Sequence, residues 1–252
     1  MSLSLDPAFF VAFLLATVRC GAWLAIAPPF AGAVPGKVRA GLAMALGLVV
    51  APQLAQSGDL PTAAPALVGA VVFQVAVGLG MGFLVMVVFQ AVSAAGSAID
   101  TFAGLSASML YDPTTRNTAS PMGRLYQMLG LIVLFLTGGH LLLVGGLVRS
   151  FQAAPATGFR VERMAELATD GVGMFLLATL QIAAPLLGAM FVTELLLGLA
   201  SRAAPQLNVM VLGFGVKSIV LVAVASAAFP LVVVGVPELT TKALGLMWSL
   251  VR

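Results

Sequence analysis

Residues 194–217 read ELLLGLASRAAPQLNVMVLGFGVK, and this stretch decides the fold. Two apolar runs flank a short polar turn, RAAPQLN, and each run carries one charge, Glu194 or Lys217. If the runs are helices folded back to back, both charges lie roughly 17 Å from the turn, because a helix rises ~1.5 Å per residue. At that depth in a bilayer a lone charge is costly and marks a function or a partner. The stretch therefore predicts a membrane hairpin with an internal ion pair.

The composition of the whole chain supports a membrane protein. The mean hydropathy is +1.11, and 61% of the residues are hydrophobic while 8% are charged. A soluble domain has about 25% charged residues. The net charge of +3 comes from scattered groups without a basic run, so we expect a chain in contact with membrane lipid and no nucleic-acid partner.

The residues that could catalyse a reaction or bind a metal form no recognisable site in the sequence. Cys20 is the only cysteine and His140 the only histidine, which excludes an internal disulfide and a metal site built from several of either residue. Cys20 lies in an apolar run and is expected to be a buried small residue. The sequence has no Walker loop, HExxH motif or dinucleotide fingerprint. We therefore expect neither enzymatic activity nor a cofactor.

The apolar runs predict an all-α, polytopic membrane protein with about six long helices, because a spanning helix needs about 20 apolar residues. Residues 237–252 are expected to form a separate, short amphipathic helix, and kinks are expected at Pro185 and Pro230. Two pairs of small residues are spaced four positions apart, Gly78 with Gly82 and Gly41 with Ala45, and we call each pair a step. Such steps are typical of closely packed membrane helices. The six runs are residues 8–30, 40–55, 66–92, 125–148, 171–200 and 207–236.

Residues 93–123 interrupt this pattern with many hydroxyl and amide side chains and two carboxylates, Asp100 and Asp112. The segment is too polar to face lipid, and non-helical backbone at membrane depth must be buried in protein or line a wet cavity. We therefore predict a re-entrant loop. Asp112-Pro113 has good turn chemistry, which fits either the tip of a pore loop or an ordinary surface turn. Arg19, in the middle of the first run, is expected to face water or a partner helix, with Asp100 as one candidate partner.

The charges of the connections orient the chain. One set holds five cations, Lys37, Arg39, Arg116, Arg124 and Arg202. The other holds three, and the C-terminal segment adds Lys242 and Arg252 to that side. The positive-inside rule places the first set in the cytoplasm and both termini outside it.

The order and spacing of three motifs resemble the FliR/SctT family of type III export gate subunits. The motifs are GFLVMVVFQAVSAAGSAIDTFAGLSASMLYDP at 82–113, LFLTGGHLLL at 134–143 and PLLGAMFVTELLLGLASRAAPQLNVMVLGFGVKSIV at 185–220. The family often has Asp where Glu194 stands and Phe where Met210 stands, and both differences preserve the character of the position.

The resemblance implies a structural channel subunit of the flagellar type III export gate, which passes unfolded flagellar proteins. Residues 1–170, with the polar segment 93–123, would resemble a FliP subunit, and residues 171–252 a FliQ hairpin with an added C-terminal helix. The implied partners are FliP-like and FliQ-like membrane subunits in a helical hetero-oligomer, an FlhB-like switch protein and the exported flagellar proteins. The implied location is the bacterial inner membrane, in the flagellar basal body. Alternatives are the same subunit of a virulence type III system, a small-solute transporter and an intramembrane enzyme.

The resemblance also implies roles for residues. A plug segment that closes the pore is carried onto residues 102–120. The Glu194–Lys217 pair becomes an assembly lock, and the turn between its two residues becomes a cytoplasmic tip. The pore and plug candidates are Asp100, Phe102, Met109, Tyr111, Asp112, Pro113, Thr114, Arg116 and Asn117, and those of the turn are Arg202, Pro205, Gln206 and Asn208.

Overall fold

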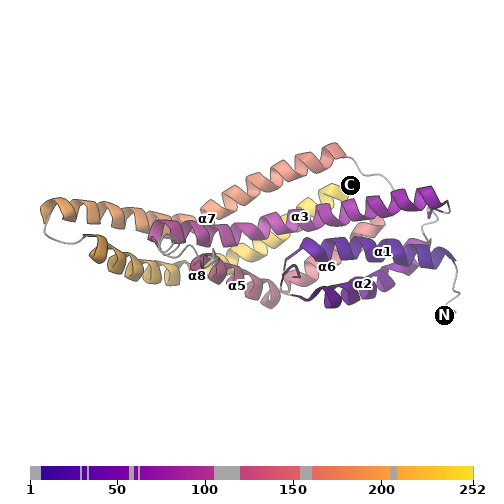
Figure 1. The fold of residues 1–252 in the computed structure, drawn as a ribbon, viewed down its shortest axis with the longest axis horizontal. Coiled ribbons are helices and arrows are strands. Elements are labelled where there is room, and N and C mark those ends of the chain that lie inside the picture. The colour runs from indigo at the N-terminus through magenta and orange to yellow at the C-terminus, as the bar shows by residue number, and fades with distance from the viewer. Residues whose placement is uncertain are drawn as a thin grey trace, which may run out of the picture. The chain divides into compact units, whose positions relative to one another are not determined.

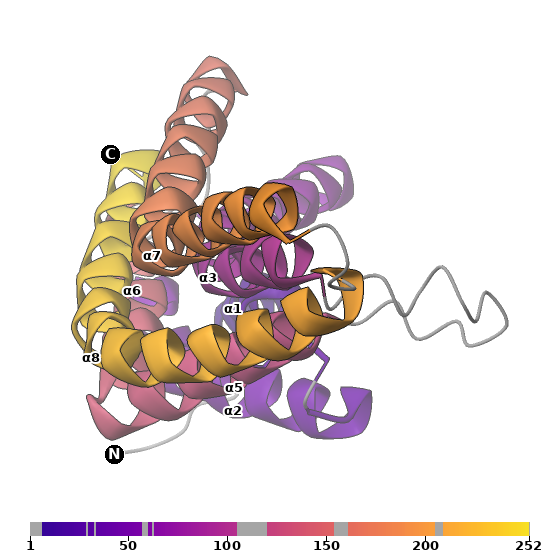
Figure 2. The same ribbon diagram turned by 90° about the vertical axis from the view of Figure 1, so that its left-hand side faces the viewer.

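Every regular element in the described part of the chain is a helix (Figure 1, Figure 2). The computed structural model describes residues 7–28, 30–32, 34–56, 60–61, 63–104, 120–153, 161–204 and 209–251, with backbone alone at 161–165, 209–212 and 251. The elements are α1 (Pro7–Ile26), α2 (Gly36–Gln56), α3 (Ala64–Ala103), α5 (Pro121–Leu136), α6 (Gly139–Ala153), α7 (Val161–Ala203) and α8 (Val209–Val251).

The predicted fold class, a polytopic helical membrane protein, is confirmed. Among the described residues, five helices are long and apolar enough to cross a membrane, or six if α5 and α6 form one broken span. Both α7 and α8 have 43 residues, or about 65 Å at ~1.5 Å per residue. Each is therefore about twice as long as the ~30 Å hydrocarbon core and must tilt, bend or protrude.

The predicted run at 125–148 is wrong as a single helix. The chain breaks at Thr137 and Gly138, where α5 ends and α6 begins. Gly138 has a φ of 71°, a left-handed conformation that glycine adopts without steric cost and that commonly ends a helix.

Other predicted boundaries are also corrected, and the fifth helix begins at Val161 rather than at residue 171. The second helix begins at Gly36 rather than at residue 40. The third continues past residue 92 to Ala103, so the first part of the polar segment is helical, with its hydroxyls bonded to the helix itself: Ser97 Oγ donates to Ser93 O at 3.1 Å. The C-terminal piece is not a separate helix, because α8 continues through Pro230 and Pro237; apolar membrane helices tolerate proline when neighbouring groups satisfy the freed carbonyls. Kinks at Pro185 and Pro230 stay a prediction.

The chain packs into two compact units. Unit 1 comprises Met1–Val88, Phe135–Gly173 and Thr240–Arg252, and unit 2 comprises Phe89–Leu134 and Met174–Leu239. The division at residue 170 into FliP-like and FliQ-like parts concerns likeness to other subunits, and it stays a prediction.

In unit 1, α1 and α2 lie side by side (Figure 1). They run antiparallel, because Gly21 faces Ala43 while Gly47 faces Thr17. The step of Gly78 and Gly82 on α3 packs against the α1 backbone, and a Cβ on Gly82 would lie 3.1 Å from Trp23 O. The other predicted step does not pack in this way, since Gly41 faces open space.

In unit 2, α3 and α5 run antiparallel, because Gly96 of α3 faces Met122 of α5 while Val92 faces Gly130. The end of α7 and the start of α8 form the hairpin predicted from the sequence (Figure 1). Its register is fixed by the contact of Gly213 with Leu197.

Candidate functional site: the junction of α3 and α5

A buried carboxylate joins the end of α3 to the start of α5. Asp100 is fully buried near the end of α3. Its Oδ2 accepts hydrogen bonds from the Ser120 hydroxyl and, at 2.9 Å, from the Met122 amide. Ser120 Oγ also accepts from the Gly123 amide at 2.8 Å. A serine before the helix and a proline at its first position form a strong N-terminal cap, and the carboxylate adds a negative charge at the positive end of the helix dipole.

The two helix backbones meet directly beside this carboxylate. A Cβ on Gly96 would lie 2.5 Å from Met122 O and 2.7 Å from Gly123 Cα. Both are backbone atoms, so a side chain at Gly96 would push the start of α5 away from α3. We call Gly96, Asp100, Ser120, Met122 and Gly123 the α3–α5 junction. It joins residues just before and just after 105–119, which lie outside the described part of the chain, and the plug at 102–120 stays a prediction.

The hairpin carries the ion pair that its sequence predicts. Lys217 Nζ and a carboxylate oxygen of Glu194 are in contact. The Lys217 side chain is 19% exposed and that of Glu194 64%. The carboxylate therefore has an open side that a further group could reach. The assembly role of the pair stays a prediction.

A pocket of about 300 Å³ connects these features. Thr101 and Phe102 of α3 form one wall, and Met190, Phe191 and Glu194 of α7 form the other. Phe102, a predicted plug residue, and Glu194, the acidic member of the ion pair, thus share one cavity. The sequence offered no signal for this, because the residues of the two walls are about ninety positions apart in the chain and their meeting depends on packing alone.

The other buried charge, Arg19, lies in unit 1. Its Nε donates to Gln74 Oε1 at 2.6 Å, and its Nη1 donates to the carbonyl and hydroxyl oxygens of Ser150 at 3.1 and 3.2 Å. The guanidinium also lies 4.2 Å from the centre of the Phe151 ring, a cation–π contact. These contacts with α3 and α6 confirm that Arg19 faces partner helices. We call these four residues the Arg19 centre.

The remaining predictions have the following outcomes. Cys20 is buried, as expected. Arg202 is exposed in the last turn of α7, where a cation favours the helix dipole. Several candidates lie outside the described residues: Met109, Tyr111, Asp112, Pro113, Thr114, Arg116, Asn117, Pro205, Gln206 and Asn208.

Sequence reasoning missed the cap of α5. The pair Ser120-Pro121 is the usual start signal of a helix, but the predicted run begins at Leu125. The partners of Arg19, Gln74 and Ser150, had no sequence signal, because a single polar residue in an apolar run does not identify its partner.

Comparison with known proteins assigns this chain to a family. The family model described as "Bacterial export proteins, family 1" matches residues 10–243 of the 252. The chain belongs to this family.

Curated relatives of this bacterial export protein agree. The flagellar biosynthetic protein FliR of Escherichia coli K12 is 33% identical over 200 residues, covering 79% of this chain and 76% of the relative. FliR of Bacillus subtilis is 29% identical over 251 residues, which cover 96% of both chains. The Yop proteins translocation protein T of Yersinia pestis is 32% identical over 184 residues, covering 72% of this chain and 70% of the relative.

The predicted resemblance to the FliR/SctT family is therefore confirmed, and with it a subunit of the type III export gate. Family membership and the apolar helices together place this export protein in the bacterial inner membrane. Its partners are accordingly other membrane components of an export apparatus.

Proposed function

We propose that this chain is a structural channel subunit of a flagellar type III export gate, and that the α3–α5 junction holds its pore plug in place. The flagellar assignment rests on the FliR relatives. The family of export-apparatus proteins favours a structural role over a catalytic one.

The observation that carries the plug assignment is the bonding of Asp100. One carboxylate oxygen accepts from both Ser120 and Met122, so the segment between α3 and α5 leaves and returns at the same buried point. A plug must block the pore against an ion gradient and must move aside when an exported chain passes. Such a loop needs ends that are held in place. The flanking helices and the buried cap provide the fixed ends.

The α7–α8 hairpin supports the proposed partners. Its outer positions are exposed and apolar on both helices, for example Leu195 and Leu199 on α7 and Ile219 on α8. Such a face must be covered by lipid or by protein. We assign FliQ-like and FliP-like subunits to it, with Glu194 and Lys217 as the polar lock, and the turn after Arg202 in the cytoplasm near an FlhB-like protein. Both termini would then lie outside the cytoplasm.

Shortening the plug tests this function. Deleting residues 114–119 should leave the gate assembled and make it permeable to small ions, because the fixed ends remain while the middle no longer fills the pore. The measurement is the ion permeability of cells that carry the deletion, with pull-down of the gate as the control for assembly. Unchanged ion permeability in an assembled gate would contradict the plug assignment.

A different experiment distinguishes a flagellar gate from a virulence gate. A strain without the gene should lose motility if the gate serves the flagellum, and the chain should restore it. A motile deletion strain that no longer secretes virulence proteins would favour the second system, to which the Yersinia relative's name refers.

A further inference from the structure

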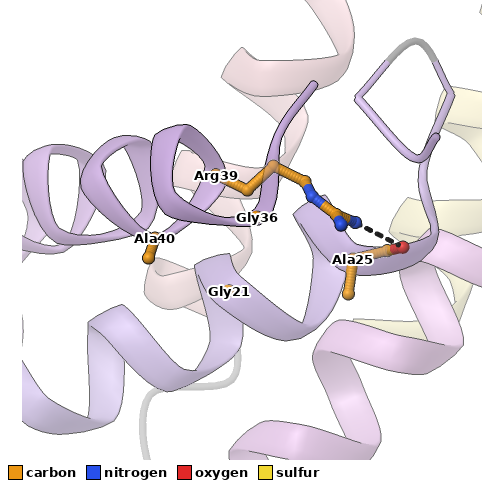
Figure 3. A pocket seen from close by; sticks show the side chains of 5 residues that line it. All are labelled: Gly21, Ala25, Gly36, Arg39 and Ala40. Atoms are coloured by element: carbon orange, nitrogen blue, oxygen red, sulfur yellow. Dashed lines mark hydrogen bonds between the residues drawn. The ribbon is translucent and has the colours of Figure 1, made fainter. Parts of the chain in front are cut away.

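A second cavity lies in unit 1, away from the α3–α5 junction. It has a volume of about 290 Å³ and is lined by Gly21 and Ala25 of α1 and by Gly36, Arg39 and Ala40 of α2. Figure 3 shows Arg39 reaching from α2 toward the end of α1. Four of the five described lining residues have no side chain larger than a methyl group, and the fifth is the arginine.

Within the described part of the chain, the guanidinium of Arg39 has one hydrogen-bond acceptor. Nη1 donates one hydrogen bond to Ala25 O at 3.3 Å, which satisfies a carbonyl of the last turn of α1. Nε is buried and has no hydrogen-bond partner within the described residues. None of the described carboxylates forms a salt bridge with Arg39. A partly buried cation without an acidic partner favours an anion from outside the chain.

We propose that this Arg39 pocket binds the phosphate of an anionic phospholipid. Arginine binds phosphate oxygens through several donors at once, and the first turn of α2, at Gly36, adds the positive end of a helix dipole. The volume lies at the lower end of small-ligand pockets, which are ~300–1,000 Å³. It therefore fits a headgroup and leaves the acyl chains outside.

The position of Arg39 along α2 favours a lipid over free phosphate. Arg39 lies in the first turn of a 21-residue helix long enough to span the membrane, which puts it at headgroup level.

The test measures bound phosphatidylglycerol on the purified, assembled gate by native mass spectrometry. We expect Arg39→Gln to lower retention of this lipid at least fivefold, because the cation is lost. Ala40→Leu should do the same by filling the pocket while leaving Arg39 in place. Arg39→Lys should retain an intermediate amount. The matched controls are Ala45→Leu, an exposed alanine of the same helix that does not line the pocket, and Lys37→Gln, a neighbouring cation outside it.

Added inorganic phosphate distinguishes the two sources of the anion. A lipid site should keep its phosphatidylglycerol in millimolar phosphate, whereas displacement by phosphate would overturn the lipid and leave a free-phosphate site. Equal retention in wild type, Ala40→Leu and Ala45→Leu would overturn the pocket altogether. If Arg39→Gln prevents assembly, the comparison of Ala40→Leu with Ala45→Leu decides alone. Loss of assembly in Ala40→Leu, with Ala45→Leu intact, would assign the pocket to a neighbouring subunit instead.

Discussion

The Arg19 centre and the α3–α5 junction both bury a charge in an apolar helical chain, but they connect different things. Arg19 bonds residues 55 and 131 positions away, and so joins three helices that are distant in sequence. Asp100 bonds residues 20 and 22 positions away, and so closes one loop. A buried charge therefore has two uses here: Arg19 holds three helices together, and Asp100 holds the end of α3 to the start of α5.

The largest expected effect is that of Arg19→Met. The change removes three hydrogen bonds that join α1 to α3 and α6, and stranding a buried polar group costs about 1–3 kcal/mol. We expect the yield of assembled gate to fall at least tenfold, which corresponds to about 1.4 kcal/mol. The measurement is pull-down of the complex. Arg149→Met, an exposed neighbour of Ser150, is the control, and equal yields of both variants would contradict the role of the centre.

Asp100→Ala should act on the closed state rather than on assembly. Without the carboxylate, Ser120 and the Met122 amide lose their acceptor, and the ends of the plug segment separate. We expect near-normal pull-down with ion permeability raised several-fold, and a smaller rise for Asp100→Asn. A loss of assembly as large as that of Arg19→Met would show that the two buried charges have the same use.

Gly96→Ala checks the junction without changing a charge. Alanine favours helix over glycine by about 1 kcal/mol, so a leak caused by this change must come from the contact with Met122 and Gly123. Gly69→Ala is the matched control in the same helix, because its position faces open space. It should leave the gate sealed.

The smallest effect is expected at the ion pair. Glu194→Gln or Lys217→Met alone should weaken assembly about two- to threefold, because each strands one charge of the pair, and Glu194 is largely exposed. The double change should partly restore assembly in pull-down. If single and double variants behave alike, the pair does not contribute as a pair.

Much of the fold was predictable from local patterns, whereas the details that make the site were not. The apolar runs indicated the membrane helices, and the symmetric spacing of Glu194 and Lys217 about the turn indicated their contact. The break at Gly138 was missed because glycine occurs throughout this chain, and only its φ reveals the left-handed turn. The cap at Ser120 was missed because its partner, Asp100, lies on another helix.

The sequence by itself determined that this chain lives in a membrane, folds as long helices, and carries a hairpin with two opposed charges. Those properties follow from composition and helical periodicity, which are local. Only the tertiary structure decided that Asp100 caps α5, that Phe102 and Glu194 share a pocket, and that Arg39 opens onto a cavity between α1 and α2. Each of these depends on which helices pack together and in what register, and that choice is made by the close fit of small residues such as Gly96 and Gly78 against a neighbouring backbone.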